Sequence, residues 1–155
     1  MDMCEFPVLL VEDNEDDILC VQRAFRRAKL SNALPVVEDG DAAVAYLSGQ
    51  GEYADRNRHP MPTLILLDIK LPRRSGLEVL EWLRAQAGLR RIPVVMLTSS
   101  KESADVDRAF DLGASGYLVK PVDFDGLLEM VKTIGVYWMV MSELPSAPLE
   151  APPPS

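Results

Sequence analysis

The 155-residue sequence has only two cysteines and one histidine, and it contains no long apolar run. Cys4 and Cys20 lack the spacing of a disulfide framework or of a metal motif, so both are expected to be free thiols. No stretch approaches the roughly 20 apolar residues that a membrane-spanning helix needs. The start of the chain has no basic region, which argues against a secretory signal and favours a cytoplasmic protein.

The sequence also has fewer basic side chains than acidic ones. Sixteen Lys and Arg residues stand against 24 Asp and Glu residues, which gives a formal charge of -8. This balance argues against nucleic-acid binding, which depends on Lys and Arg contacts to phosphate, and against a basic membrane-surface role. The length and the apolar share of 48% suit one globular domain with a single core.

Short apolar segments alternate along the chain with segments of helical periodicity. We expect strands at residues 8–11, 34–37, 63–67, 94–97 and 117–119, and helices at 14–29, 42–47, 77–83, 102–112 and 124–141. Short apolar strands separated by helices are typical of a parallel sheet that is buried on both faces. The pattern therefore predicts an α/β fold, a doubly wound five-stranded parallel sheet with helices on both faces.

Two segments lack such a pattern. Residues 50–62 are polar and are expected to form an exposed loop. Residues 145–155 are rich in Pro and Ala and are expected to be disordered. One domain, with an extended C-terminal helix, is thus predicted over residues 1–144.

Polar side chains follow four of the predicted strands. Glu12 and Asp13 follow the first strand, Asp68 the third, Thr98 the fourth and Lys120 the fifth. The carboxyl ends of parallel strands form the ligand-binding edge of such a sheet, so these side chains are expected to meet. Carboxylates ~4 Å apart repel one another by roughly 4 kcal/mol at an effective dielectric of about 20. A compensating cation is therefore expected.

Oxygen ligands without His or Cys favour Mg²⁺. Asp68 is then a candidate nucleophile that forms an aspartyl phosphate, with Thr98 and Lys120 stabilising the charge of the phosphoryl group. Each residue also has an ordinary interpretation, Thr98 as a turn hydroxyl and Lys120 as a solvated amine. Residues 15–17 are interpreted as solvated acids at a helix start, and His59 is assigned no role.

The set Glu12-Asp13, Asp68, Thr98 and Lys120-Pro121 resembles the receiver domain of two-component response regulators. Thr98 follows Asp68 by 30 residues and Lys120 follows it by 52 residues, which is similar to the spacing in that family. The resemblance covers about residues 6–140 and implies the flavodoxin-like strand order 2-1-3-4-5. It also implies that Asp68 is the phosphoacceptor, which takes a phosphoryl group from a phosphohistidine on a partner sensor histidine kinase.

The same resemblance implies the roles of further residues. It implies a Mg²⁺ site with the ligands Glu12, Asp13, Asp68 and the backbone carbonyl of Lys70. Thr98 and Lys120 would contact the new phosphate, and Thr98 and Tyr117 would be the switch residues. A cis peptide bond before Pro121 is also expected, as is usual in the family.

The segment 49–61 and the extended last helix resemble small single-domain regulators that partner bacterial phytochrome kinases. Apolar side chains cover the end of this helix beyond its core-facing stripe. They are Val136, Tyr137, Trp138, Met139 and Val140. A helix that is apolar nearly all round is usually buried. We expect a homodimer contact here; the alternative is packing on the same domain.

Two other functions are alternatives to a stand-alone phosphorylation-switched regulator. A Mg²⁺-dependent phosphatase of the haloacid-dehalogenase type usually has a second Asp two residues after the nucleophile, where this sequence has Lys70. A pseudo-receiver that binds partners without phosphorylation has no need of the complete acidic set. The sequence therefore favours a signalling protein over an enzyme. Its output would be protein contact, or transfer to a His-phosphotransfer protein in a phosphorelay.

Overall fold

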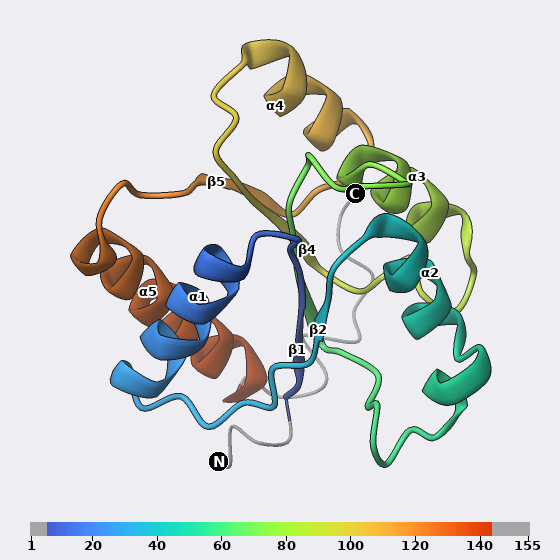
Figure 1. Ribbon diagram of the computed structural model, residues 1–155, viewed down its shortest axis with the longest axis horizontal. Coiled ribbons are helices and arrows are strands. Elements are labelled where there is room, and N and C mark those ends of the chain that lie inside the picture. The colour runs from blue at the N-terminus through green and yellow to red at the C-terminus, as the bar shows by residue number, and fades with distance from the viewer. Residues whose placement is uncertain (1–5, 144–155) are drawn as a thin grey trace.

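The computed structural model describes residues 6–143, with side chains described as far as residue 136. Its sheet has five parallel strands in the order β2-β1-β3-β4-β5, which confirms the predicted fold class and strand order (Figure 1). The strands are β1 (Val8–Val11), β2 (Val36–Val37), β3 (Leu64–Leu67), β4 (Val94–Thr98) and β5 (Gly116–Val119). The second strand is shorter than predicted and lies at the sheet edge, where Pro35 is tolerated.

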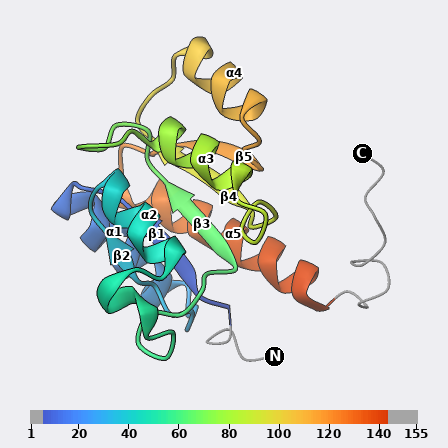
Figure 2. The ribbon, with the colours of Figure 1, turned by 90° about the vertical axis from the view of Figure 1, so that its right-hand side faces the viewer.

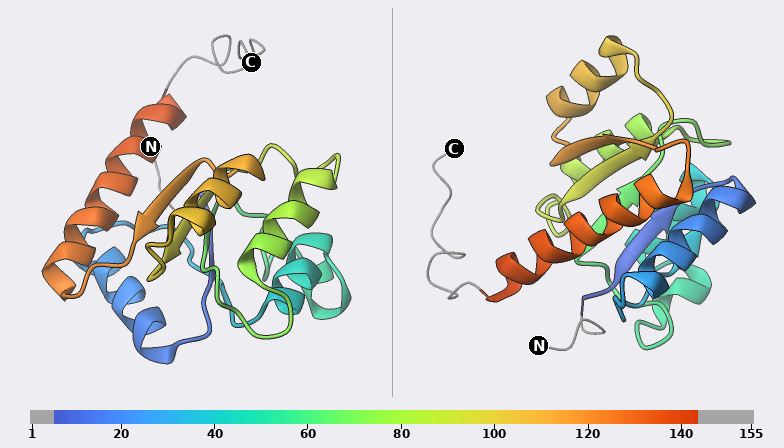
Figure 3. Two further views of the ribbon diagram at one scale, coloured as in Figure 1. Left: turned by 90° about the horizontal axis from the view of Figure 1, so that it is seen from above. Right: turned by 90° about the vertical axis from the view of Figure 1, so that its left-hand side faces the viewer.

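Helices cover both faces of the sheet (Figures 1 and 3). They are α1 (Glu15–Arg27), α2 (Gly40–Ser48), α3 (Gly76–Ala85), α4 (Ser103–Asp111) and α5 (Phe124–Glu143), with a 3₁₀ helix, η2, at Gly51–Ala54. Alternate residues of β3 supply the two cores. Ile65 and Leu67 pack with α2, α3 and α4, whereas Leu64 and Leu66 pack with α1 and α5. The unbroken apolar run is thus explained by burial on both sides.

Local capping sets the helix starts at the carboxyl edge of the sheet. Asn14 and Asp39 accept hydrogen bonds from the backbone N–H three residues later, at the N-termini of α1 and α2. Ser75 and Glu78 form a reciprocal capping box at the start of α3. These caps begin each helix immediately after the loop that leaves a strand, so the loops near Asp68 are short and held at both ends.

Residues 50–62 are more ordered than the predicted exposed loop. The rings of Tyr53 and His59 lie 5.1 Å apart at 81°, and Tyr46 contacts both. Arg56 donates hydrogen bonds to the carbonyls of Tyr46, Leu47 and His59, which satisfies the C-terminal end of α2. His59 therefore has a packing role that its isolated place in the sequence did not indicate.

Helix α5 continues to Glu143, two residues beyond its predicted end, and its C-terminal part extends past the sheet (Figure 2). Val136 is 63% exposed, while the side chains of residues 137–143 and the predicted tail 145–155 lie outside the described part. Among the residues described, no helix has the length and apolar character needed to cross a membrane.

Gly76 lies against the phosphoacceptor candidate. A Cβ atom at this position would lie 1.9 Å from the carbonyl oxygen of Asp68. We expect Gly76→Ala to lower the free energy of unfolding by about 1–3 kcal/mol because the β3–α3 loop must move. Urea denaturation measures the change. Gly88→Ala is the matched control, since nothing lies within 4 Å of its added Cβ. Equal midpoints for the two variants would contradict the close approach.

Candidate functional site

The carboxylates after β1 and β3 meet because the two strands are neighbours. Val11 pairs with Leu67, so the next residues of both strands emerge side by side. The Asp68 N–H also donates to the Val11 carbonyl at 3.1 Å. Carboxylate oxygens of Glu12, Asp13 and Asp68 lie within 4.8 Å of one another. The structure therefore brings together the three acids that the sequence placed at this edge.

The three acids differ in burial. Glu12 is 2% exposed and Asp68 is 7% exposed, whereas Asp13 is open to solvent. The Ile69 N–H donates to Asp68 Oδ1 at 2.7 Å, which orients the carboxylate. Lys70, two residues after Asp68, has an exposed side chain. A hard divalent cation suits this donor set, because all of its side-chain ligands are oxygens and one side is open to water.

Lys120 closes the site from β5. Its Nζ lies 2.5 Å from Glu12 Oε1, 2.8 Å from Asp17 Oδ2 and 2.9 Å from Asp68 Oδ2. The side chain is only 15% exposed, so the interpretation as a solvated amine is wrong. The interpretation of Asp17 as a solvated acid is also incomplete. An acid in the first turn of a helix is common for dipole reasons alone, so nothing in the sequence signalled this contact.

Burial and charge shift two pKa values in the site. Burial raises the pKa of Glu12 to about 7, and the hydrogen bond from Lys120 offsets only part of that effect. Burial alone would lower the pKa of Lys120, but the hydrogen bonds to Asp17, Glu12 and Asp68 outweigh it and raise the pKa. Lys120 therefore stays charged and offsets part of the negative charge of these carboxylates.

Thr98 is fully buried at the end of β4, and it belongs to a second network. The Ser100 N–H donates to Thr98 Oγ1 at 3.3 Å, and the Tyr117 hydroxyl donates to the Ser100 carbonyl at 2.9 Å. The Ser100 hydroxyl donates to Asp105 in the first turn of α4. Ser100 and Asp105 were not among the residues predicted from the sequence. Their only signal was a hydroxyl after a strand and an acid at a helix start.

The expected cis bond before Pro121 is wrong. No cis peptide bond occurs among the described residues, so Lys120 and Pro121 are joined in the trans form. For a bond to proline the trans isomer is intrinsically favoured by about 0.5–1 kcal/mol. The cis expectation came from the family resemblance, and no residue near Pro121 had indicated it.

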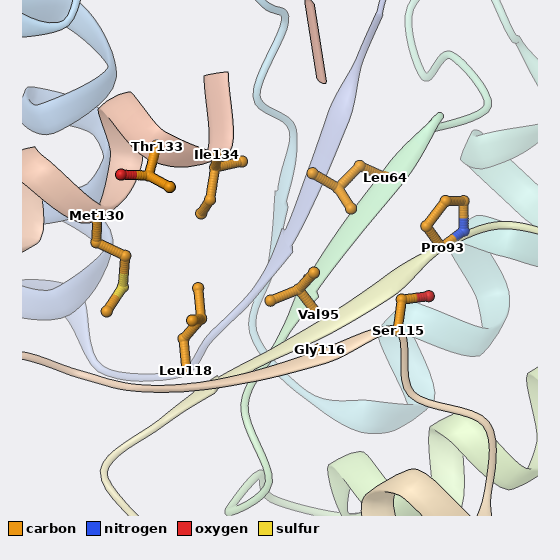
Figure 4. A pocket seen from close by; sticks show the side chains of 9 residues that line it. All are labelled: Leu64, Pro93, Val95, Ser115, Gly116, Leu118, Met130, Thr133 and Ile134. Atoms are coloured by element: carbon orange, nitrogen blue, oxygen red, sulfur yellow. The ribbon is translucent and has the colours of Figure 1, made fainter. Parts of the chain in front are cut away.

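An apolar groove of about 610 Å³ lies away from this site, between the β3–β5 part of the sheet and α5 (Figure 4). Leu64, Pro93 and Gly116 line it, and these residues lie at or just before the starts of their strands. Asp68 follows the end of β3. The groove and the carboxylate cluster therefore lie at opposite ends of the strands, and the groove takes no part in the chemistry of the carboxylates.

Comparisons with known proteins agree with this geometry. The family model described as the response regulator receiver domain matches residues 8–132. The chain is 39% identical to the response regulator Rcp1 of Synechocystis sp. over 140 residues, which cover 90% of this chain and 93% of Rcp1.

Solved structures are similar over the same extent. The phosphorylated cyanobacterial phytochrome response regulator RcpA matches with a TM-score of 0.82 and 37% identity, over 90% of this chain and 98% of RcpA. The Mn²⁺-bound form of Rcp1 matches with a TM-score of 0.79 and 38% identity, over 90% of this chain and 99% of Rcp1.

The raised pKa of Glu12 predicts how the binding of a divalent cation, tested with Mg²⁺, depends on pH. Below a pKa of about 7, Glu12 holds a proton that competes with the ion, and above it the carboxylate is free. The affinity is therefore expected to fall by up to about tenfold per pH unit below 7 and to level off above it. Calorimetric titration between about pH 5.5 and 8 measures the trend. Glu12→Gln should bind the ion more weakly, and its affinity should not change with pH in this way. A wild-type affinity that stays constant over this pH range would contradict the prediction.

Proposed function

Since this chain belongs to the response regulator receiver domain family, we propose that Asp68 accepts a phosphoryl group from a partner sensor histidine kinase in a Mg²⁺-dependent reaction. The phosphorylated protein then signals in the cytoplasm through altered protein contacts. The observation that carries the proposal is the cluster of Glu12, Asp13 and Asp68 carboxylates beside the buried ammonium of Lys120. A reaction that brings an anionic phosphoryl group to a carboxylate needs cationic charge beside it, which Lys120 and a divalent ion held by these carboxylates would supply.

In the proposed reaction, a carboxylate oxygen of Asp68 attacks the phosphorus of a phosphohistidine. An O–P bond forms, the N–P bond breaks, and the histidine nitrogen leaves with the bonding electrons. Glu12, Asp13 and Asp68, with the backbone carbonyl of Lys70, would hold Mg²⁺, which supplies positive charge next to the phosphoryl oxygens. Lys120 then exchanges a carboxylate partner for a phosphoryl oxygen.

The Thr98 network supports the proposed switch. If the Thr98 hydroxyl donates to the phosphoryl group, its contact with the Ser100 N–H is altered. Ser100 also holds Tyr117 of β5 and Asp105 of α4, so a shift at Ser100 reaches both elements. Phosphorylation thereby biases the surface formed by α4 and β5, which is the element that a downstream partner would contact.

We further propose that the kinase is bacteriophytochrome-like. The support is the match to RcpA, a phytochrome response regulator, over 90% of this chain and 98% of RcpA. A His-phosphotransfer protein of a phosphorelay presents the same phosphohistidine chemistry and is a second proposed partner.

The acceptor is tested with a small donor. Incubation with acetyl phosphate and Mg²⁺ should add the mass of one phosphoryl group to the wild-type protein and to Asp111→Asn, an exposed control on α4. Asp68→Asn should gain nothing, because its amide is a poor nucleophile, and EDTA should block the wild-type reaction. Intact-protein mass spectrometry gives the readout. A label that persists in Asp68→Asn would refute the assignment, and steady turnover of phosphate esters would favour a phosphatase.

A homodimer contact at the end of α5, over Val136 to Val140, is part of the proposal. Val136 is 63% exposed. Ile134 lines the apolar groove together with Met130 (Figure 4). Val136, two residues later, lies on nearly the opposite side of the helix, so apolar side chains face both sides of α5 near its end. The residues that follow Val136 up to Val140 are all apolar in the sequence, and a contiguous apolar patch of this kind would favour an interaction site.

We expect Val136→Asp to shift the protein toward monomer, because a charge would be buried in the contact. Light scattering over a range of protein concentrations measures the mass. Leu19→Asp on α1 is the matched control, since Leu19 is 62% exposed and lies on a different helix. If both variants keep the mass of the wild-type protein, Val136 takes no part in a dimer.

A further inference from the structure

Asp17 is the third carboxylate that contacts Lys120, and hydrogen bonds hold both its backbone and its side chain. It is the third residue of α1, and its N–H donates to Asn14 Oδ1 at 2.9 Å. The N-cap thus fixes the backbone, while Asp17 Oδ2 accepts from Lys120 Nζ at 2.8 Å. Its neighbours in the first turn, Glu15 and Asp16, are exposed to solvent. Of these three adjacent acids, Asp17 is therefore the one whose side chain lies in the site.

Asp17 differs from the other two partners of Lys120. Glu12 and Asp68 belong to the group whose oxygens can hold one divalent ion, and Asp17 does not. A carboxylate that ligates an ion has less negative charge left for an ammonium group. Asp17 is therefore the partner that Lys120 can keep unchanged when an ion is bound. Its side chain is 41% exposed, against 15% for Lys120, so it lies on the solvent side of the ammonium.

We propose that Asp17 is a positioning residue that keeps the Lys120 ammonium beside Asp68 while Glu12 and Asp68 are engaged with Mg²⁺. This inference rests on the proposed metal site. An ammonium has three N–H donors, and all three have carboxylate partners in the structure. With one donor held by Asp17, the other two are directed at Glu12 and Asp68, beside the carboxylate that would accept the phosphoryl group.

The first test measures Lys120 directly. A short pulse of acetic anhydride is applied to the full-length protein with saturating Mg²⁺ or with EDTA, and acetylation of Lys120 is quantified by peptide mass spectrometry relative to the exposed Lys101. In Mg²⁺, Asp17→Asn should raise Lys120 acetylation roughly fivefold over wild type. In EDTA the increase should be smaller, because Glu12 and Asp68 still hold the ammonium.

Two variants separate positioning from general charge effects. Asp16→Asn removes the same charge from the same helix turn without a contact to Lys120, and it should match the wild-type protein. Asp17→Glu keeps a carboxylate on a side chain one methylene longer and should restore part of the protection. Circular dichroism checks that each variant is folded.

The rate of Asp68 phosphorylation distinguishes positioning by Asp17 from an effect of its negative charge alone, because the two predict rate changes in opposite directions. With acetyl phosphate, Asp17→Asn should lower the maximal rate of Asp68 phosphorylation about fivefold and leave the Mg²⁺ concentration for half-maximal rate unchanged. If Asp17 acted only through its negative charge, its removal would speed attack on an anionic donor, as Asp16→Asn would then also do.

Failure of the positioning role of Asp17 can be distinguished from failure of the proposed metal site. Mg²⁺ binding is first measured by calorimetry on the same protein. If Mg²⁺ binds and Lys120 acetylation in Asp17→Asn equals that of wild type, the positioning role is overturned and the metal site stands. If calorimetry detects no Mg²⁺ binding, the metal site is overturned, and the inference about Asp17 falls with it.

Discussion

Repulsion among carboxylates at one edge of the sheet is the constraint on which the rest of the structure depends. Glu12 and Asp68 are almost completely buried, and like charges about 4 Å apart cost roughly 4 kcal/mol per pair at an effective dielectric of about 20. The ammonium of Lys120 offsets this cost from β5. Lys120 contacts Glu12 and Asp68 because β1, β3, β4 and β5 are consecutive neighbours in the sheet. The strand order therefore places the positive charge where it offsets the repulsion between the carboxylates.

The parts of this arrangement that the sequence predicted follow from short-range rules. The apolar run of β3 that ends at Asp68 predicts a strand buried on both faces, and strand ends in a parallel sheet share one edge. Asn14 and Asp123, residue types favoured at helix N-caps, stand at the starts of two predicted helices, and their side chains accept backbone hydrogen bonds there. These features depend on a few adjacent residues, so they can be predicted from the sequence alone.

Other features depend on balances that the sequence alone does not reveal. Asp17 has the same local preference as its two acidic neighbours, and only the position of Lys120, 103 residues away, distinguishes it. The isomer before Pro121 rests on a small energy difference. The ring contacts of His59 with Tyr46 and Tyr53 form across a segment without periodicity. In each case several arrangements are acceptable locally, so the local sequence does not select one.

The placement of the apolar groove at the starts of the strands has a consequence for the evolution of such proteins. Two of its lining residues, Leu64 and Pro93, lie at or just before the starts of β3 and β4, whereas Asp68 follows the end of β3. Substitutions at the one end can therefore accumulate without altering the reactivity of the other. A lineage can change what its members assemble with and keep its phosphate chemistry, because the sheet separates the two tasks by the length of a strand.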